Sequence, residues 1–339
     1  MPSRQRLRTT AASSIADAVP ERSSASASRA ISREQTIASN LLLEAELLRI
    51  LRIFRESDVP CVVLKGIPLA RRLYGAIDER VITDNDLLVH RVDARRACSV
   101  LEEDGYQPLP FLDLERRLRC TNQYLLYKRD AGISRLVEIH WSAFSTALFD
   151  VPESSQWSHT KDFELRGTHI RVFDAPLTLA HLAAHFAQHG FAELRILRQL
   201  ARAWNSWSDA HAAALALADS IAVGPALDYA LSAAAHFGWL VSPPPPRDLS
   251  WRARQLLRLL PLHGLTDDPA LERSYTRQLL LLLIADPRVL ARSIAQRFFP
   301  PLDELASTYR KPIGRTLYAR YPSYWLRPLI RLVRGIPTS

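Results

Sequence analysis

The amino-acid sequence predicts an α+β fold in its first half and an all-helical second half. Three observations support this prediction. Short apolar runs with strand character alternate with helical patterns up to about Ala175. After Pro176 the chain becomes rich in Ala and Leu at helical spacing. The 339 residues are also enough to bury a substantial core. We therefore expect a flexible leader at 1–35, an α+β core at 36–175 and a helical domain at 176–339.

The first elements of the core are a helix, a strand and a second helix. Apolar residues at helical spacing predict an amphipathic helix over Thr36–Ser57, with an apolar face made of Leu41, Leu42, Leu47, Leu48, Leu51 and Phe54. The following Asp-Val-Pro breaks that helix. Cys61–Leu64 then reads as a short buried strand, and Gly66–Tyr74 as a helix that ends at Gly75.

The rest of the core adds strands around one more helix. Asp86–Val89 predicts a strand buried on both faces, because Leu87, Leu88 and Val89 follow one another without a polar residue. A helix follows over Asp93–Asp104. Gln123–Lys128 and Arg135–Trp141 predict two strands joined by a turn, and His169–Phe173 predicts a last strand.

The second half shows helical patterns and no strand pattern. Four consecutive prolines within Ser242–Pro246 predict a stiff, extended linker. The expected helices are Leu177–Gln188, Phe191–Trp207, Ala210–Ala222, Pro225–Phe237, Leu249–Leu260 and Leu271–Ile284.

The charge is concentrated at the ends of the chain. The net charge is +9, of which residues 1–35 carry +3 and residues 287–339 carry +8, so the central region is close to neutral at −2. This distribution disfavours a central nucleic-acid platform. The basic C-terminal segment is interpreted as a solvated helical tail, with binding of an acidic partner as the alternative.

The cysteines and the hydropathy indicate an intracellular, non-membrane protein. The three cysteines show no CxxC spacing, and two of them lie in apolar periodic segments, as expected of buried thiols in a reducing compartment. The longest apolar runs are too short to span a bilayer, and the first residues lack the apolar stretch of a signal peptide. We therefore expect a cytoplasmic location and no membrane partner.

Two pairs of polar residues in the core suggest a metal site. Side chains alternate along a strand, so Asp84 shares a face with Asp86, and Glu138 shares a face with His140. Carboxylates at the end of a buried strand need compensation, and Mg²⁺ prefers such oxygen ligands. The alternative is a solvent-exposed Asp-Asn-Asp loop without a ligand, because such short motifs often occur without a function.

A lysine and a glycine end the first strand. Lys65 directly precedes the helix predicted from Gly66, whose N-terminus offers free N–H groups to an anion, while glycine allows close approach. Arg80 could neutralise further phosphate oxygens, or it could be a surface arginine. The strand, the turn and the carboxylates together favour metal-assisted phosphoryl or nucleotidyl transfer.

Three histidines follow one face of the first helix in the second half. His181, His185 and His189 are spaced four residues apart. Such spacing can bind zinc, although no cysteine lies nearby to complete the ligand set. The other readings are a wall of a nucleotide or acceptor cleft, and buried histidines that serve packing.

The ordered set of motifs resembles a known superfamily. Leu64-Lys65-Gly66, Arg80, Asp84-Asn85-Asp86-Leu87-Leu88-Val89, Gly105-Tyr106 and Glu138-Ile139-His140-Trp141 resemble the polymerase-beta-like nucleotidyltransferases, in a branch where Lys-Gly replaces Gly-Ser. The helical half matches that branch through His181-Leu182, His185, His189-Gly190-Phe191 and Leu194. The chain departs from the pattern at Ile67, where a serine often contacts phosphate, and at Gln199, where an acid is expected.

The resemblance implies a small mixed sheet with flanking helices and an enzyme that moves a nucleoside monophosphate from an NTP to an acceptor hydroxyl or phosphate. It implies two Mg²⁺ ions held by Asp84, Asp86 and Glu138, with His140 as a further catalytic residue. The nucleotide, with ATP as one candidate, would be bound by Lys65, Gly66, Arg80 and the three histidines. The acceptor would be a small molecule or a peptide, since some members lie beside lasso-peptide genes, or less readily RNA. An inactive nucleotide-sensing or partner-binding module is the rival reading.

Overall fold

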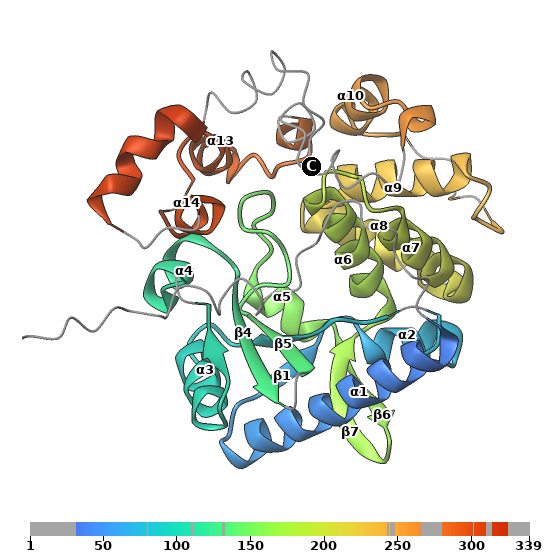
Figure 1. Cartoon of the computed structure of the whole chain (residues 1–339). Helices are drawn as coiled ribbons and strands as arrows, with labels where there is room; N and C mark the ends of the chain where they lie inside the picture. The colour runs from blue at the N-terminus through green and yellow to red at the C-terminus, as the bar shows by residue number, and fades with distance from the viewer. Residues whose placement is uncertain are drawn as a thin grey trace, which may run out of the picture.

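The computed structural model has the architecture that the sequence predicts, with a mixed sheet and its helices first and a largely helical half after them (Figure 1). It describes residues 32–324 except 80, 110–111, 131–132, 243, 245–247, 266–279, 301 and 310–313. The predicted leader up to residue 31, Arg80 and the start of the helix predicted at Leu271 lie outside the described residues.

One seven-stranded sheet forms the centre of the first half, in the order β3-β4-β5-β2-β1-β7-β6. Strand β2 runs parallel to β5, and β1 runs parallel to β7, while the other neighbours are antiparallel. The strands are β1 (Cys61–Val63), β2 (Asp84–Val89), β3 (Gln107–Pro108), β4 (Gln123–Asp130), β5 (Ile133–His140), β6 (Thr160–Leu165) and β7 (Thr168–Phe173).

Strands β3 and β6 have no counterpart in the prediction. Both are edge strands of the sheet. Strand β6 carries three charged residues and keeps most of its side chains accessible, so the sequence lacks the apolar alternation that marks a half-buried strand. Its pairing with β7 across a Gly167 turn defines it instead.

The helices of the first half are α1 (Arg33–Glu56), α2 (Ile67–Tyr74), α3 (Ala94–Glu103), α4 (Leu114–Cys120) and α5 (Glu153–Ser158). Helix α1 begins three residues earlier than predicted because Ser32 and Gln35 form a reciprocal capping box. The short helices α4 and α5 were not predicted.

The buried face of α1 differs from the predicted one. Leu41 and Leu42 are exposed, whereas Leu43 and Ile50 are buried together with the predicted Leu47. Glu44 is also buried, because Arg71 and Arg166 from distant parts of the chain pair with its two oxygens at 2.6 and 3.2 Å. The helix therefore turns a mixed apolar and acidic face to the sheet.

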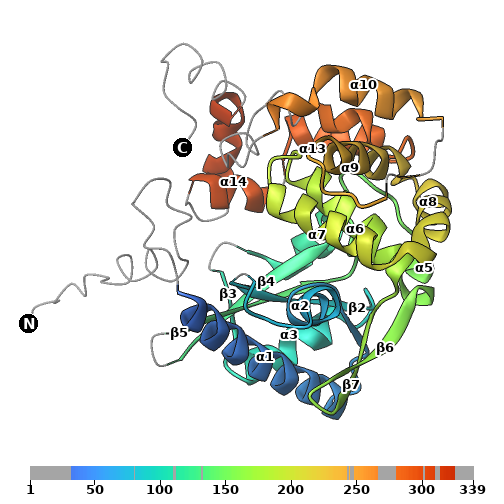
Figure 2. The ribbon, with the colours of Figure 1, turned by 90° about the vertical axis from the view of Figure 1, so that its right-hand side faces the viewer.

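The second half packs against the other face of the sheet. Both views place α1 on one side of the sheet and helices α6 to α9 on the opposite side (Figures 1 and 2). Val62 and Leu88 project from the strands into the same hydrophobic cluster as Leu182 and Phe186 of α6. Val63 and Leu87 project the other way, toward the cluster that contains Leu47 and Phe54 of α1.

The helices of the second half are α6 (Ala175–Gln188), α7 (Leu194–Ser206), α8 (His211–Ser220), α9 (Gly224–His236), α10 (Trp251–Leu259), α13 (Leu290–Phe298) and α14 (Leu302–Tyr309). They follow the predicted order with shifted ends as far as α10, whereas α13 and α14 were not predicted as separate helices. The described end of the last predicted helix is a short 3-10 turn, Leu281–Leu283. Among the described helices, none combines the length and apolar character needed to cross a bilayer.

Candidate active site

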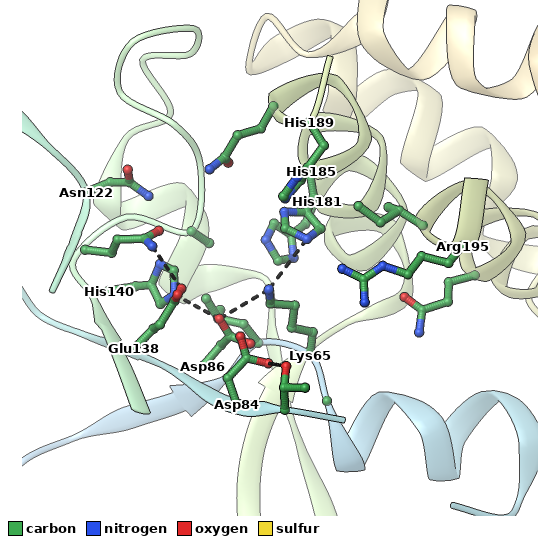
Figure 3. Close-up of a pocket in the computed structure, with 18 residues that line it drawn as sticks. Lys65, Asp84, Asp86, Asn122, Glu138, His140, His181, His185, His189 and Arg195 are labelled. Carbon is green, nitrogen blue, oxygen red and sulfur yellow. Dashed lines mark hydrogen bonds and ion pairs between the residues drawn. The ribbon is translucent and has the colours of Figure 1, made fainter. Parts of the chain in front are cut away.

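The carboxylates converge because of strand alternation and register. Strands β2 and β5 pair in parallel, with Asp86 opposite Glu138 and Leu88 opposite His140. Asp84 enters the same strand two residues before Asp86, so it shares the face that looks toward α6. All four polar side chains line one pocket between the sheet and helices α6 and α7 (Figure 3).

Asp86 lies at the centre of this polar cluster. Its side chain is buried, and its Oδ1 atom is 3.1 Å from His140 Nε2 and 3.3 Å from Lys65 Nζ. His140 Nε2 is also 3.3 Å from Glu138 Oε2. The Oδ2 atom of Asp86 and the Nδ1 atom of His140 are buried without a hydrogen-bond partner, so both atoms are available to interact with a ligand.

The ligand atoms of Asp86, Glu138 and His140 lie within 4.8 Å of one another. Among the described residues, these two carboxylates and one histidine form the group whose spacing would allow a metal ion to bind. The sequence placed Asp84 in the metal set and gave His140 a different role. The structure brings Asp84 into the same pocket, beside this group.

The charges in the pocket shift one another's protonation. Burial raises the pKa of Asp84 to about 6, and the neighbouring Asp86 carboxylate adds to the rise. Burial also disfavours ionised Asp86, but Lys65 and the His140 hydrogen bond outweigh it and lower the pKa of this carboxyl. The pKa of the Lys65 ammonium is raised, because the carboxylates overcome its desolvation. The pocket therefore shifts the pKa values of Asp84 and Asp86, two residues of the same motif, in opposite directions.

Lys65 and Gly66 lie where the sequence placed them, at the end of β1 and the start of α2. Gly66 is the N-cap residue with φ of +74°, a backbone conformation that favours glycine. The first turn of α2 then contains Ile67 and Pro68, so it offers neither a hydroxyl nor a full set of N–H donors. Lys65 Nζ also lies 3.5 Å from His185 Nε2, which links the sheet to α6.

The three histidines of α6 have different surroundings. His181 is buried, with edge-to-face contacts to Phe144 and Phe173, and burial lowers its pKa to about 3. His185 is also held neutral, since burial and the nearby Lys65 lower its pKa well below the usual value. His189 Nδ1 lies 3.0 Å from Glu193 Oε1. Among the described residues, the three histidines do not form a metal-binding group, so the zinc reading receives no support.

Several pocket residues were not identified from the sequence. Gln123 donates to Glu138 Oε2 at 2.9 Å from the neighbouring strand β4. Arg195, in the first turn of α7, points its guanidinium across the pocket toward Lys65 and His185 (Figure 3). No local pattern distinguishes either side chain, because both acquire their roles from the packing of separate elements.

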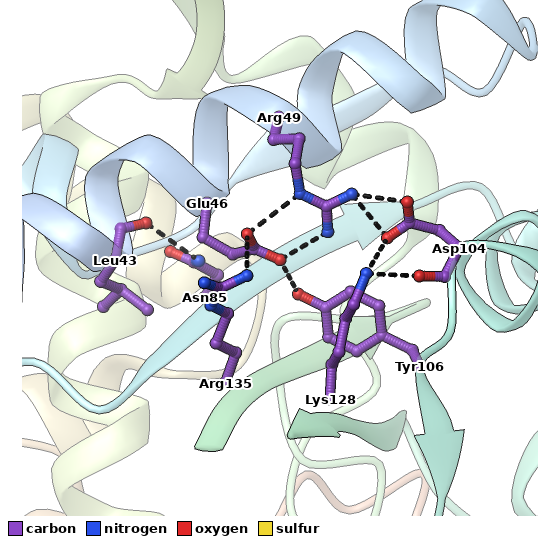
Figure 4. Close-up of polar contacts among 8 residues, drawn as sticks. All are labelled: Leu43, Glu46, Arg49, Asn85, Asp104, Tyr106, Lys128 and Arg135. Carbon is purple, nitrogen blue, oxygen red and sulfur yellow. Dashed lines mark hydrogen bonds and ion pairs between the residues drawn. The ribbon is translucent and has the colours of Figure 1, made fainter. Parts of the chain in front are cut away.

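A network of polar and charged side chains connects α1 with β2 and β5 on the face of the sheet opposite the carboxylates. Asn85, between the two aspartates, points to the opposite face of β2 and donates to Leu43 O of α1 at 3.4 Å (Figure 4). On the same side, Arg135 of β5 pairs with buried Glu46 of α1 at 3.2 Å. The Tyr106 hydroxyl also donates to Glu46. Helix α1 therefore holds β2 and β5 together behind the carboxylates.

A comparison with protein-family models identifies the chain. Residues 3–238, about two thirds of the sequence, match the model described as "Uncharacterised nucleotidyltransferase". The chain belongs to this nucleotidyltransferase family. Comparison with curated proteins and with solved structures gives no significant match. The matched segment contains every residue of the pocket, from Leu64 to Gln199, and family membership implies an NTP substrate.

Proposed function

We propose that this nucleotidyltransferase uses Mg²⁺ to transfer a nucleoside monophosphate from an NTP to an acceptor hydroxyl or phosphate. The observation that carries the proposal is the register of β2 and β5, which sets Asp86 opposite Glu138 with Asp84 on the same face. Carboxylates from two adjacent strands that line a polar pocket are the ligands that Mg²⁺ takes in phosphoryl transfer.

The residues present fit magnesium. The donor set of Asp84, Asp86 and Glu138 is made of oxygen atoms, and the buried Oδ2 atom of Asp86 lacks a hydrogen-bond partner. We propose that these three side chains hold two Mg²⁺ ions, as the ordered motifs suggest. When bound, the metal supplies positive charge to the triphosphate and to the attacking oxygen.

The protein groups around the carboxylates have distinct tasks in this proposal. Glu138, held by Gln123, accepts the proton of the acceptor group or binds metal at that point. His140 orients Glu138 and Asp86 through its Nε2 atom. Lys65 binds phosphate oxygens as a point charge, and the backbone at Gly66 approaches them closely.

The acceptor is proposed to be a small molecule or a peptide. The central part of the chain is close to neutral, which disfavours an RNA acceptor. Peptide tailoring follows from the resemblance described above, and within this proposal ATP is one candidate donor among the four NTPs.

A second candidate is an inactive nucleotide-sensing module. The ion pairs of Asp86 with Lys65 and His140 compensate the buried carboxylate without any metal. A site neutralised in this way could bind a nucleotide and perform no chemistry. The two candidates differ in whether nucleotide binding requires Mg²⁺ and whether pyrophosphate is released.

A thermal-shift screen tests the proposal. The chain is heated with ATP, GTP, CTP or UTP, each with and without Mg²⁺, beside the double variant Asp84→Asn/Asp86→Asn. A ligand at a hundredfold excess over its Kd adds about 2.7 kcal/mol to the free energy of unfolding. We expect a Mg²⁺-dependent shift for at least one NTP that the variant lacks, followed by pyrophosphate release when an acceptor is supplied. Nucleotide binding that does not depend on Mg²⁺ would favour the sensing module, and the absence of any nucleotide binding would contradict both candidate functions.

A further inference from the structure

We infer that Arg195 binds the terminal phosphates of the triphosphate from the wall opposite the metal ligands. This assignment rests on the proposed function and adds a residue that none of the motifs contains. The guanidinium belongs to the helical half of the chain and points into the pocket toward Lys65 (Figure 3).

The charges that line the pocket give the first reason. Among the described residues that line the pocket, there is one lysine, Lys65, and one arginine, Arg195. The Lys65 ammonium lies 3.3 Å from Asp86, so its charge is shared between this carboxylate and the phosphate that we propose it binds. A triphosphate carries several negative charges, and the metal ions proposed above share theirs with three carboxylates. Arg195 is in place to supply a further positive charge from the facing wall.

The start of α2 gives the second reason. In many anion sites at a helix N-terminus, hydroxyls and N–H groups of the first turn bind the phosphate. Here Ile67 is fully buried and apolar, and Pro68 has no N–H to donate. The α2 end therefore supplies few donors, and a forked guanidinium from the facing wall compensates for them.

The guanidinium is prepared for this task by its neighbours. Its Nε and Nη2 atoms each lie 2.6 Å from Glu193 Oε2, and the other Glu193 oxygen lies 3.0 Å from His189 Nδ1. Among the described residues, no partner engages Nη1. The hydrogen bond from His189 keeps Glu193 ionised by lowering its pKa to about 2 against the effect of burial. Glu193 thus holds the Nε and Nη2 atoms of Arg195, and the Nη1 atom remains available to a ligand.

The test measures binding of Mg²⁺–NTP and of the corresponding NMP by calorimetry, with the full chain. Arg195→Gln removes the charge and keeps a shorter polar side chain, and Arg195→Lys keeps the charge without the fork. Arg198→Gln is the matched control, one turn further along α7, where the guanidinium stacks on Trp239 instead of lining the pocket. Unfolding midpoints confirm that each variant is folded.

We expect Arg195→Gln to weaken Mg²⁺–NTP binding about tenfold or more, as loss of a charge-assisted hydrogen bond implies. NMP binding should change by less than about twofold, Arg195→Lys should lie between, and Arg198→Gln should match the wild type. NTP affinity unchanged in Arg195→Gln, or NTP and NMP affinities reduced equally, would overturn the role of Arg195 while leaving the proposed function intact. A wild-type chain that binds no Mg²⁺–NTP would overturn the proposed function and this inference together.

Discussion

Replacing Asp84 by Asn should stabilise the metal-free protein and destabilise it relative to the wild type once Mg²⁺ and NTP are present. Asp84 is mostly buried beside Asp86, and burial is the larger cause of its raised pKa of about 6. The ordinary value is 3.8. Asparagine has the same shape and can still accept the hydrogen bond that Thr83 donates at 3.3 Å, so the substitution changes mainly the charge.

The magnitude follows from the pKa shift. A rise of about two pKa units corresponds to about 3 kcal/mol of unfavourable free energy for the ionised form, and partial exposure to solvent reduces this to about 1–3 kcal/mol. Between pH 3.8 and 6 the native state binds more protons than the unfolded state, so stability falls as pH rises through this window. At pH 7.5 the full cost is present, and at pH 4 or below it is largely absent.

Thermal unfolding in EDTA and in Mg²⁺ with NTP measures both effects. In EDTA at pH 7.5, Asp84→Asn should unfold about 2–6 °C above the wild type, and the difference should shrink at pH 4. In Mg²⁺ and NTP the wild type should gain stability that the variant lacks, so their order reverses. Asp150→Asn, an exposed aspartate outside the pocket, is the control and should change neither midpoint. A variant that is less stable in EDTA, or that gains as much as the wild type from Mg²⁺ and NTP, would refute the reasoning.

Three further predictions concern single side chains. Glu138→Gln should reduce pyrophosphate release at least about a hundredfold, in the range that loss of a positioned acid–base group produces, with the fold retained by circular dichroism; near-normal turnover would exclude Glu138 from the chemistry. His181→Phe should flatten the pH dependence of stability. The native His181 stays neutral down to about pH 3 while the unfolded chain takes up its proton below 6.5, so the wild type should lose about 1.4 kcal/mol more than the variant between pH 7.5 and 5.5 in urea titrations; parallel curves would show a charged His181. Tyr106→Phe should lower the free energy of unfolding by about 2 kcal/mol, because buried Glu46 loses a hydrogen-bond donor; a change below about 0.5 kcal/mol would mean that Arg49 and Arg135 satisfy this carboxylate alone.

The residues that share a face could be predicted from the sequence, because alternation along a strand is a local property. Asp84 and Asp86 share a face of β2, and Glu138 and His140 share a face of β5, as the alternation predicts. The register that sets Asp86 opposite Glu138 depends on how two distant strands pair. That pairing was suggested only by the resemblance of the ordered motifs, and local spacing alone does not determine it.

Features that depend on partners far along the chain were missed. The buried face of α1 was predicted from apolar residues, but Glu44 and Glu46 are buried there because arginines at 71, 135 and 166 reach them. Arg195 was missed for the same reason, since the face of α7 that meets the pocket is decided by how α7 packs on α2 and α6. A periodic pattern identifies an apolar stripe, and it does not identify a polar residue whose partner lies elsewhere.

The two halves of the chain build one pocket. The carboxylates come from the sheet, whereas His185 and Arg195 come from α6 and α7. A single hydrophobic cluster runs from Val62 and Leu88 of the sheet into α6, so the helical wall is held at a set distance from the strands. The contact of 3.5 Å between Lys65 and His185 is one result of that packing. Residues 36–175 alone would therefore carry the proposed metal ligands but lack the facing cation, and the boundary near Ala175 separates two parts of one site.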